Sequence, residues 1–216
     1  KHGFQSLINF EFKWNAKDMS YDELFSHYSS ILNNELKEYG VLNYLSSHDD
    51  GSPFDPKRLK PYETANKLLL APGAAQIYYG DETARTLVIP NAVGDATLRS
   101  NMNWLALQQN KNIQAIHLHW QKLGQFRNNH PAIGAGIHTK ITELPYTFKR
   151  TYTKANFTDK VVVGLDMNKG EKNLNVTGVF EDNTSVKDAY SNTVAHVKNG
   201  KVTINSPYTI VLLEAN

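Results

Sequence analysis

The sequence contains no cysteine, which excludes structural disulfides and metal sites built on thiolates. This absence does not identify a compartment, because it fits a cytosolic protein as well as a secreted one stabilised by its core. Basic residues are scattered and the formal net charge is only +2, so a nucleic-acid-binding surface is not predicted. No apolar run approaches the roughly 18 residues that a membrane span requires.

What remains is the composition of a folded protein. Hydrophobic residues make up 40% and charged residues 20% of the chain, as in ordinary globular domains. Its 216 residues provide enough chain for one large domain or two small ones. The chain begins at Lys1, with neither a methionine nor the pattern of a signal peptide, so we expect the natural N-terminus to lie elsewhere.

The first part of the chain alternates between strand and helix patterns. Short apolar runs at 4–12, 42–48 and 75–80 predict buried strands. Between them, apolar residues recur at helical spacing, and Ser20 and Glu23 are placed to form a capping box. Strands that alternate with helices indicate βαβ units and a parallel sheet. Three such units are too few for a closed (β/α)₈ barrel, so this part resembles a piece of something larger.

From about Gly136 the pattern changes to short, alternating runs separated by turn signals such as Asn-Lys-Gly. Such runs are typical of an antiparallel β-sandwich. The chain is therefore predicted to divide into an α/β part, residues 1–135, and an all-β part, residues 136–216.

Ionisable residues follow two of the predicted strands. The stretch "VLNYLSSHDDGSPFD" (41–55) places His48, Asp49 and Asp50 side by side, and Asp81 and Glu82 follow the third strand. Adjacent carboxylates repel each other and resist burial, so each cluster is either a solvated loop or a site. In parallel α/β folds, chemistry takes place at the carboxyl ends of the strands.

Four segments, in this order, resemble the α-amylase family of glycoside hydrolases. "NYLSSHDD" resembles its fourth conserved region, and "LLLAPGAAQIYYGDE" resembles its helix, turn and eighth strand. "DATLRSNMNW" is similar to the loop that follows, and "HWQKLGQFRNNHPAIGAG" to the last barrel helix. The β part, ending in "SPYTIVLLEAN", is similar to the family's domain C. The resemblance covers roughly residues 40–216.

The resemblance implies a partial TIM barrel, strands six to eight, followed by domain C. It also implies cleavage of α-1,4-glucosidic bonds of starch or maltooligosaccharides with retention. By analogy Asp49 would be the catalytic carboxylate that stabilises the transition state, and His48, Asp95, Arg99 and Tyr79 would bind the substrate. A carboxylate suits this role, because hydrogen bonds to the sugar 2-OH strengthen as the oxocarbenium-like state forms.

The chain departs from the family pattern in three respects. Ser47 stands where the family usually has asparagine, and Ala74 and Ala75 replace the usual proline. The motifs of the nucleophile and the acid/base, and the calcium ligands, have no match upstream of residue 40. We therefore expect the C-terminal part of an enzyme, inactive alone, that needs the missing half of the barrel or self-association. Calcium is expected in the full-length enzyme and no metal in this chain; an extracellular or periplasmic location is favoured.

Other interpretations stay open for single residues. Asp50 fits a bystander better than a catalytic group. Asp81 and Glu82 fit a structural pair, and Asp95 and Arg99 could form an i,i+4 surface ion pair. A histidine pair, His117 and His119, lies two residues apart on a predicted helix and points to different sides, which favours structural roles over a metal site.

Other functions also remain. One is a non-catalytic α-glucan-binding protein that kept the cleft and lost the acids, and another is a related α-glucosidase or transglycosylase. A metal phosphohydrolase with His48 and Asp49 as ligands is disfavoured, because such pairs sit on helices whereas this one follows a predicted strand.

Overall fold

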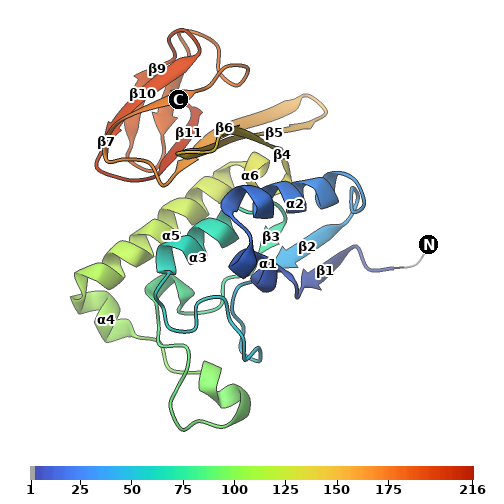
Figure 1. Ribbon diagram of the computed structural model, residues 1–216, viewed down its shortest axis with the longest axis vertical. Helices are drawn as coiled ribbons and strands as arrows, with labels where there is room; N and C mark the ends of the chain where they lie inside the picture. Colours follow the sequence, from blue (N-terminus) through green and yellow to red (C-terminus); the bar gives the residue numbers. More distant parts are fainter. Residues whose placement is uncertain (1–2) are drawn as a thin grey trace. The chain divides into compact units, whose positions relative to one another are not determined.

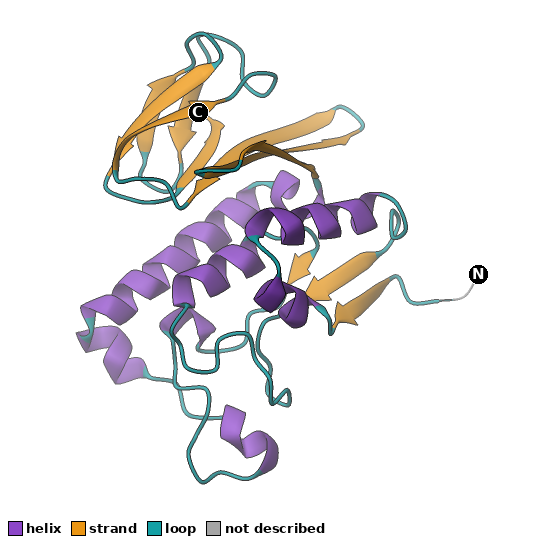
Figure 2. Cartoon of the chain, in the orientation of Figure 1, coloured by secondary structure: helices purple, strands orange, loops and turns teal. Residues whose placement is uncertain are grey.

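The computed structural model describes residues 3–216 and contains two compact units, which divide between Gln125 and Phe126. Figure 1 follows the chain from its N-terminal to its C-terminal end. The first unit contains a parallel sheet with helices, and the second is dominated by antiparallel strands. The prediction of a mixed α/β part followed by an antiparallel β part is thus confirmed (Figure 2).

The sheet of the first unit has the strand order β1-β2-β3, and both pairings are parallel. The strands are β1 (Ser6–Asn9), β2 (Gly40–Asn43) and β3 (Ala74–Ala75). Helices α1 (Phe12–Asp18) and α2 (Tyr21–Asn33) connect β1 to β2, and α3 (Pro61–Leu69) leads into β3. Two parallel strands cannot be joined by a tight turn, because the chain must return to the starting edge of the sheet before the second strand begins. A crossover helix makes this return.

The first strand is shorter than predicted, because its second half is helical. Phe12 and Ala16 lie one turn apart on α1, and both are completely buried. A short apolar run does not distinguish a buried strand from the start of a buried helix.

The predicted strand 42–48 also ends early, at Asn43. The next residues, Tyr44 to Ser47, are buried as predicted, but their backbone leaves the sheet. The Leu45 carbonyl accepts a hydrogen bond from the Phe54 amide over 2.8 Å, so this stretch pairs with its own loop. The third strand, predicted at 75–80, is reduced to two residues.

Helix α2 begins as the sequence predicts. The Ser20 side chain accepts a hydrogen bond from the Glu23 amide, and the Glu23 carboxylate accepts one from the Ser20 amide. This reciprocal capping box satisfies two donors at the helix N-terminus. Leu24, Phe25 and Tyr28, at helical spacing, form the buried face. Further along are α4 (Trp104–Gln109) and α5 (Lys111–Asn129).

The second unit contains a six-stranded sheet of order β4-β5-β6-β11-β8-β9 and a two-stranded sheet of order β10-β7. All its strand pairings are antiparallel. The strands are β4 (Ile137–Thr142), β5 (Tyr146–Lys154), β6 (Phe157–Leu165), β7 (Gly170–Asn175), β8 (Ser185–Asp188), β9 (Thr193–His196), β10 (Lys201–Ser206) and β11 (Val211–Ala215).

By contact clustering the second unit starts at Phe126, within α5, and it includes the short helix α6 (Pro131–Ala135), which contacts β5 and β6.

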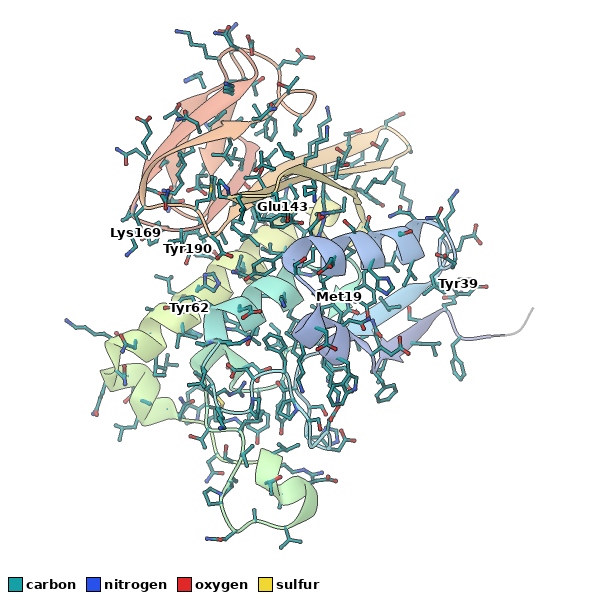
Figure 3. All side chains as sticks on the ribbon, in the orientation of Figure 1. Met19, Tyr39, Tyr62, Glu143, Lys169 and Tyr190 are labelled. Atoms are coloured by element: carbon teal, nitrogen blue, oxygen red, sulfur yellow. The ribbon has the colours of Figure 1, made fainter. Side chains whose placement is uncertain are left out.

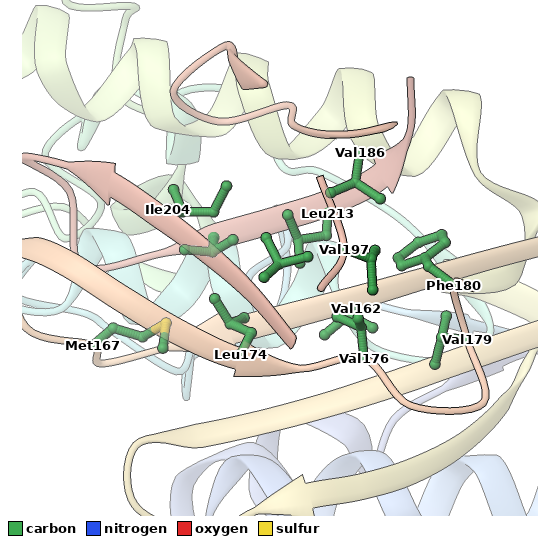
Figure 4. Packing of buried hydrophobic residues seen from close by; sticks show 12 residues of the cluster. Val162, Met167, Leu174, Val176, Val179, Phe180, Val186, Val197, Ile204 and Leu213 are labelled. Carbon is green, nitrogen blue, oxygen red and sulfur yellow. The ribbon is translucent and has the colours of Figure 1, made fainter. Parts of the chain in front are cut away.

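Both sheets of the second unit contribute to one hydrophobic core (Figure 4). Val162 of β6 and Leu213 of β11 come from the larger sheet, and Leu174 of β7 and Ile204 of β10 come from the smaller one. Strand β10 alternates strictly between exposed and buried residues, which is the period-2 pattern of a sheet with one face on a core. Burial of this shared apolar surface stabilises the pair of sheets.

No helix within residues 3–216 is both long enough and apolar enough to cross a membrane.

Candidate active site

The parallel strands end at one edge of the sheet, and the polar loops leave from there. Asn9 closes β1 and Asn43 closes β2, and the two residues are in register. The Asn9 side-chain amide donates to the Asn43 side-chain oxygen over 2.9 Å, and the Asn43 amide donates to the Pro72 carbonyl over 2.8 Å. This chain of side-chain bonds fixes the edge from which the loops after β2 and β3 emerge.

Asp49 lies in the loop after β2 with its side chain in solvent. The side chain is 59% exposed, and that of the neighbouring His48 is 62% exposed. The Ser47 hydroxyl donates to Oδ1 of Asp49 over 2.9 Å, whereas Nε2 of His48 lies 3.7 Å from Oδ2, too far for a hydrogen bond. Ser47, the residue that departs from the family pattern, therefore orients the Asp49 carboxylate.

Arg99 connects a second loop to this one. Its Nε atom donates to the His48 backbone carbonyl over 3.2 Å, and its Nη2 atom lies 3.6 Å from Oδ2 of Asp95. Asp95 belongs to the 3₁₀ helix η2 (Gly94–Leu98), and both side chains are about half exposed. The i,i+4 ion pair between Asp95 and Arg99 that the sequence allowed is present, at a long distance. Arg99 also donates a hydrogen bond to the loop of His48 and Asp49.

Tyr78 and Tyr79 are held against this second loop. The Tyr78 hydroxyl donates to the Leu98 carbonyl over 2.9 Å, and the Tyr79 hydroxyl donates to the Ser100 carbonyl over 2.8 Å. Tyr78 is 7% exposed and Tyr79 is 41% exposed, so one ring is core and the other reaches the surface. The five residues proposed from the sequence thus lie on loops that hydrogen bonds connect.

Asp50, next to Asp49, has a different environment. It forms an ion pair with the buried Lys13, and it accepts hydrogen bonds from the Tyr44 hydroxyl over 3.1 Å and the Ser52 amide over 3.0 Å. Burial alone would raise the pKa of Asp50, but the hydrogen bonds from these donors lower it below its ordinary value. In turn, burial and the nearby Asp50 raise the pKa of Tyr44 to about 12. Asp50 therefore fixes the loop by its contacts.

Asp81 is enclosed beneath the loops. It is 2% exposed, forms a 2.7 Å ion pair with Arg58, and accepts a hydrogen bond from the Ser46 hydroxyl. Burial raises the pKa of Asp81 above its ordinary value, and Arg58 and Ser46 oppose this effect. The neighbouring Glu82 accepts a hydrogen bond from the Gly80 amide over 2.9 Å. These contacts are those of a structural pair that joins the loops after β2 and β3.

His119 is buried in the first unit. Its Nε2 atom lies 3.1 Å from Oδ1 of Asn66, and its ring lies 5.0 Å from that of Tyr62, which is labelled in Figure 3. Burial lowers the pKa of His119 to about 4, so the imidazole is neutral at pH 7. Within residues 3–216, no three or more His, Asp or Glu side chains are grouped so that they could hold a metal ion.

The sequence did not point to Arg58 or Arg85. Both lie in polar stretches without periodicity, and both bind residues that are distant in the chain. The "YYGDE" segment could have given a signal: if Asp81 had been taken as buried, a cation would have been expected beside it, because a buried carboxylate needs a partner.

No protein-family model matches the chain. A search of curated proteins finds the periplasmic alpha-amylase of Escherichia coli (strain K12), 37% identical over 165 residues that make up 76% of this chain. Among solved structures, an Anoxybacillus alpha-amylase matches all of this chain with a TM-score of 0.61 and 20% identity. A structure of AmyP with maltotriose matches 98% of it with a TM-score of 0.65 and 14% identity.

The chain spans only part of each of these proteins, namely 23% of the Escherichia coli protein and 48% and 50% of the two solved chains. The solved structures support the fold, and the Escherichia coli protein supports the relationship in sequence. The chain is accordingly a relative of the α-amylase family of glycoside hydrolases.

Proposed function

We propose that this chain forms one side of the substrate cleft of an α-amylase-like enzyme that hydrolyses α-1,4-glucosidic bonds of starch or maltooligosaccharides with retention. The observation that carries the proposal is the hydrogen bond from Arg99 to the His48 carbonyl. It joins the loop of His48 and Asp49 to the loop of Asp95 and Arg99. The residues proposed to bind neighbouring sugars are therefore held in place relative to one another. The maltotriose complex of AmyP, a protein of the same fold, supports an α-glucan ligand.

In this proposal Asp49 stabilises the transition state. Its exposed carboxylate is an acceptor for sugar hydroxyls; the Ser47 hydroxyl donates to Oδ1, and Oδ2 lies 3.7 Å from Nε2 of His48. Hydrogen bonds from the sugar 2-OH to an ionised acceptor strengthen as positive charge develops on the ring. His48, attached to the same loop, would bind the same sugar.

The neighbouring sugar would be held by Asp95 and Arg99, with Tyr79 beside them. A carboxylate and a guanidinium together offer acceptors and donors for vicinal hydroxyls. The 3.6 Å separation of the two groups leaves both able to make shorter bonds to a sugar. The half-exposed Tyr79 ring offers an apolar surface for the face of a pyranose.

Hydrolysis with retention also requires a nucleophile and an acid/base whose carboxyl groups lie about 5–5.5 Å apart. The segments that match the family do not include these groups, so we propose that the chain binds α-glucans but does not hydrolyse them alone. The first five strands of the barrel, or self-association, would complete the sheet at β1. Around this strand four large apolar residues are each at least 50% exposed, namely Phe4, Leu7, Ile8 and Phe10.

Calcium would belong to the part of the enzyme that supplies the other carboxylates. The match to a periplasmic alpha-amylase supports a periplasmic or extracellular location for this chain as well.

The test is a calorimetric titration of the purified chain with maltotriose and with cellotriose, together with a reducing-sugar assay on starch. We expect maltotriose to bind, cellotriose to bind at least tenfold more weakly, and no reducing sugar to appear. Equal affinity for both trisaccharides would contradict an α-glucan site, and release of reducing sugar by the chain alone would contradict the proposed division of the catalytic groups.

A further inference from the structure

Arg85 is among the largest completely buried side chains of the molecule, 1% exposed, and it follows the 3₁₀ helix η1 (Asp81–Thr83). A guanidinium is costly to bury unless its donors are satisfied. Its Nε atom donates to the Tyr79 carbonyl over 3.0 Å, and its Nη1 atom donates to the Ser100 carbonyl over 3.1 Å and to the Ser100 hydroxyl. The Leu98 carbonyl lies 3.4 Å from Nη2, a longer contact.

The acceptors of Arg85 lie on Tyr79 and on the two residues next to Arg99, and Tyr79 and Arg99 are both proposed sugar contacts. Leu98 and Ser100 flank Arg99, and their carbonyls also accept the hydroxyl groups of Tyr78 and Tyr79. Three buried or half-buried side chains therefore hold the backbone on both sides of Arg99. The backbone at Arg99 is fixed while its own side chain stays half exposed.

Arg85 also supports the Tyr79 ring directly. The Cζ atom of its guanidinium lies 4.0 Å from the centre of this ring, within the range of a cation–π contact. The Tyr78 ring meets the Tyr79 ring edge to face at 4.7 Å. Together with the hydroxyl bond to Ser100, these contacts fix the ring in position and orientation and leave its exposed part for a ligand.

The backbone is adapted to Arg85 at Gly80. This glycine has φ of +84°, and a Cβ atom placed there would lie 2.4 Å from Nε of Arg85. Only glycine combines this conformation with such a close approach. The turn after the two tyrosines thus provides the space that the guanidinium occupies.

We propose that Arg85 is a positioning residue of the sugar site, which fixes the segment 98–100 and the Tyr79 ring so that Arg99 and Tyr79 face the same ligand. This proposal rests on the proposed function, since it assigns to that site the residue that preorganises it. Preorganised side chains lose less entropy on binding, and small displacements of such groups weaken binding strongly.

The test compares Arg85→Gln with Arg150→Gln. Arg150 is a matched control, because it is also completely buried, donates to a backbone carbonyl (that of Ile133, over 2.5 Å) and lies over an aromatic ring (Phe148, 4.9 Å), but in the other compact unit. The first readout needs no sugar: it is the NMR signal of the Arg99 Nε–H group, which donates to His48 in the wild type. The second readout is the dissociation constant for maltotriose.

In Arg85→Gln we expect the Arg99 Nε–H signal to lose its protection from solvent exchange and the affinity for maltotriose to fall about tenfold. In Arg150→Gln both should match the wild type, although both variants lose stability. Ser100→Ala removes one acceptor of Arg85 and serves if Arg85→Gln does not fold; it should shift the Arg99 signal and lower the affinity by a smaller factor.

The positioning role would be overturned if the Arg99 signal were unchanged in Arg85→Gln, whatever the affinity for maltotriose. The same holds for Ser100→Ala if that variant is used instead. A wild-type chain that binds no maltotriose but has a protected Arg99 signal would instead overturn the proposed function and the sugar-binding part of this proposal, and leave the structural role of Arg85 standing. Equal losses of affinity in the Arg85 and Arg150 variants would attribute the effect to general destabilisation and contradict the proposal.

Discussion

The Nε atom of Arg99 donates a hydrogen bond to the backbone carbonyl of His48 over 3.2 Å, across 51 residues of chain. This bond connects the loop that follows β2 to the loop that follows β3. The acceptor is a backbone atom, so the His48 side chain stays exposed beside Asp49. The geometry thus distinguishes residues that hold the loops from residues that are free to face a ligand.

Asp49→Asn is expected to weaken maltotriose binding about fivefold, because a neutral acceptor makes weaker hydrogen bonds than an ionised one. The free energy of unfolding should change by no more than about 0.5 kcal/mol, since the side chain is mostly exposed. Calorimetry and urea denaturation measure the two quantities.

Asp50→Asn is the matched control in the neighbouring residue, and it is expected to lower stability rather than affinity. Lys13, whose side chain is 5% exposed, would lose its ionised partner, so the free energy of unfolding should fall by about 2 kcal/mol or more. The affinity of the folded protein for maltotriose should change less than in Asp49→Asn. If instead Asp50→Asn proved stable and bound poorly, the roles assigned to the two aspartates would be reversed.

Ser47→Ala tests the orientation of Asp49. The variant removes the hydroxyl that donates to Oδ1 over 2.9 Å, and one such bond contributes about 1 kcal/mol, or about fivefold in affinity. We expect Ser47→Ala alone to weaken maltotriose binding by this factor. In a protein that already carries Asp49→Asn, adding Ser47→Ala should not weaken binding further. A double-mutant cycle measures this coupling, and strictly additive effects would refute it.

Gly80→Ala tests the space occupied by Arg85. The new Cβ would meet the Arg85 side chain at a residue with positive φ, so we expect a loss of about 2 kcal/mol or more in the free energy of unfolding. Gly124→Ala is the control, because this glycine lies within α5 and a Cβ there meets nothing within 4 Å. It should stabilise the protein by about 0.5–1 kcal/mol; a similar response from both variants would contradict the account.

His119 should make stability depend on pH. Its pKa is lowered to about 4 in the folded chain from an ordinary value near 6.5, so the unfolded chain binds the extra proton first. The contribution is complete above about pH 6.5 and is lost as the pH falls towards 4, by about 2 kcal/mol at pH 5. Urea denaturation at pH 7.5 and pH 5.0 should show this loss in the wild type and a smaller one in His119→Gln. Equal losses in both proteins would show that other groups are responsible.

Local patterns predicted much of the fold. The capping box of α2 uses residues three apart, and the alternation along β10 follows from one face on a core, so neither depends on distant parts of the chain. The strands of the first unit were overestimated at Phe12 and at Tyr44, where buried residues continue but sheet pairing stops. Strands β4 and β9 lie at the edges of the larger sheet and have mostly polar or exposed residues, so their sequences gave a weak signal.

By itself the sequence determined the order of elements, the change from a parallel to an antiparallel part, and the resemblance on which Asp49, His48, Asp95, Arg99 and Tyr79 were chosen. Only the tertiary structure decided what neighbouring and chemically identical groups do. Asp49 and Asp50 are adjacent carboxylates, but Asp49 accepts a hydrogen bond from Ser47, whereas Asp50 forms an ion pair with the buried Lys13. Burial and long-range partners set the role of each charge, and both arise from how distant segments pack rather than from any local pattern.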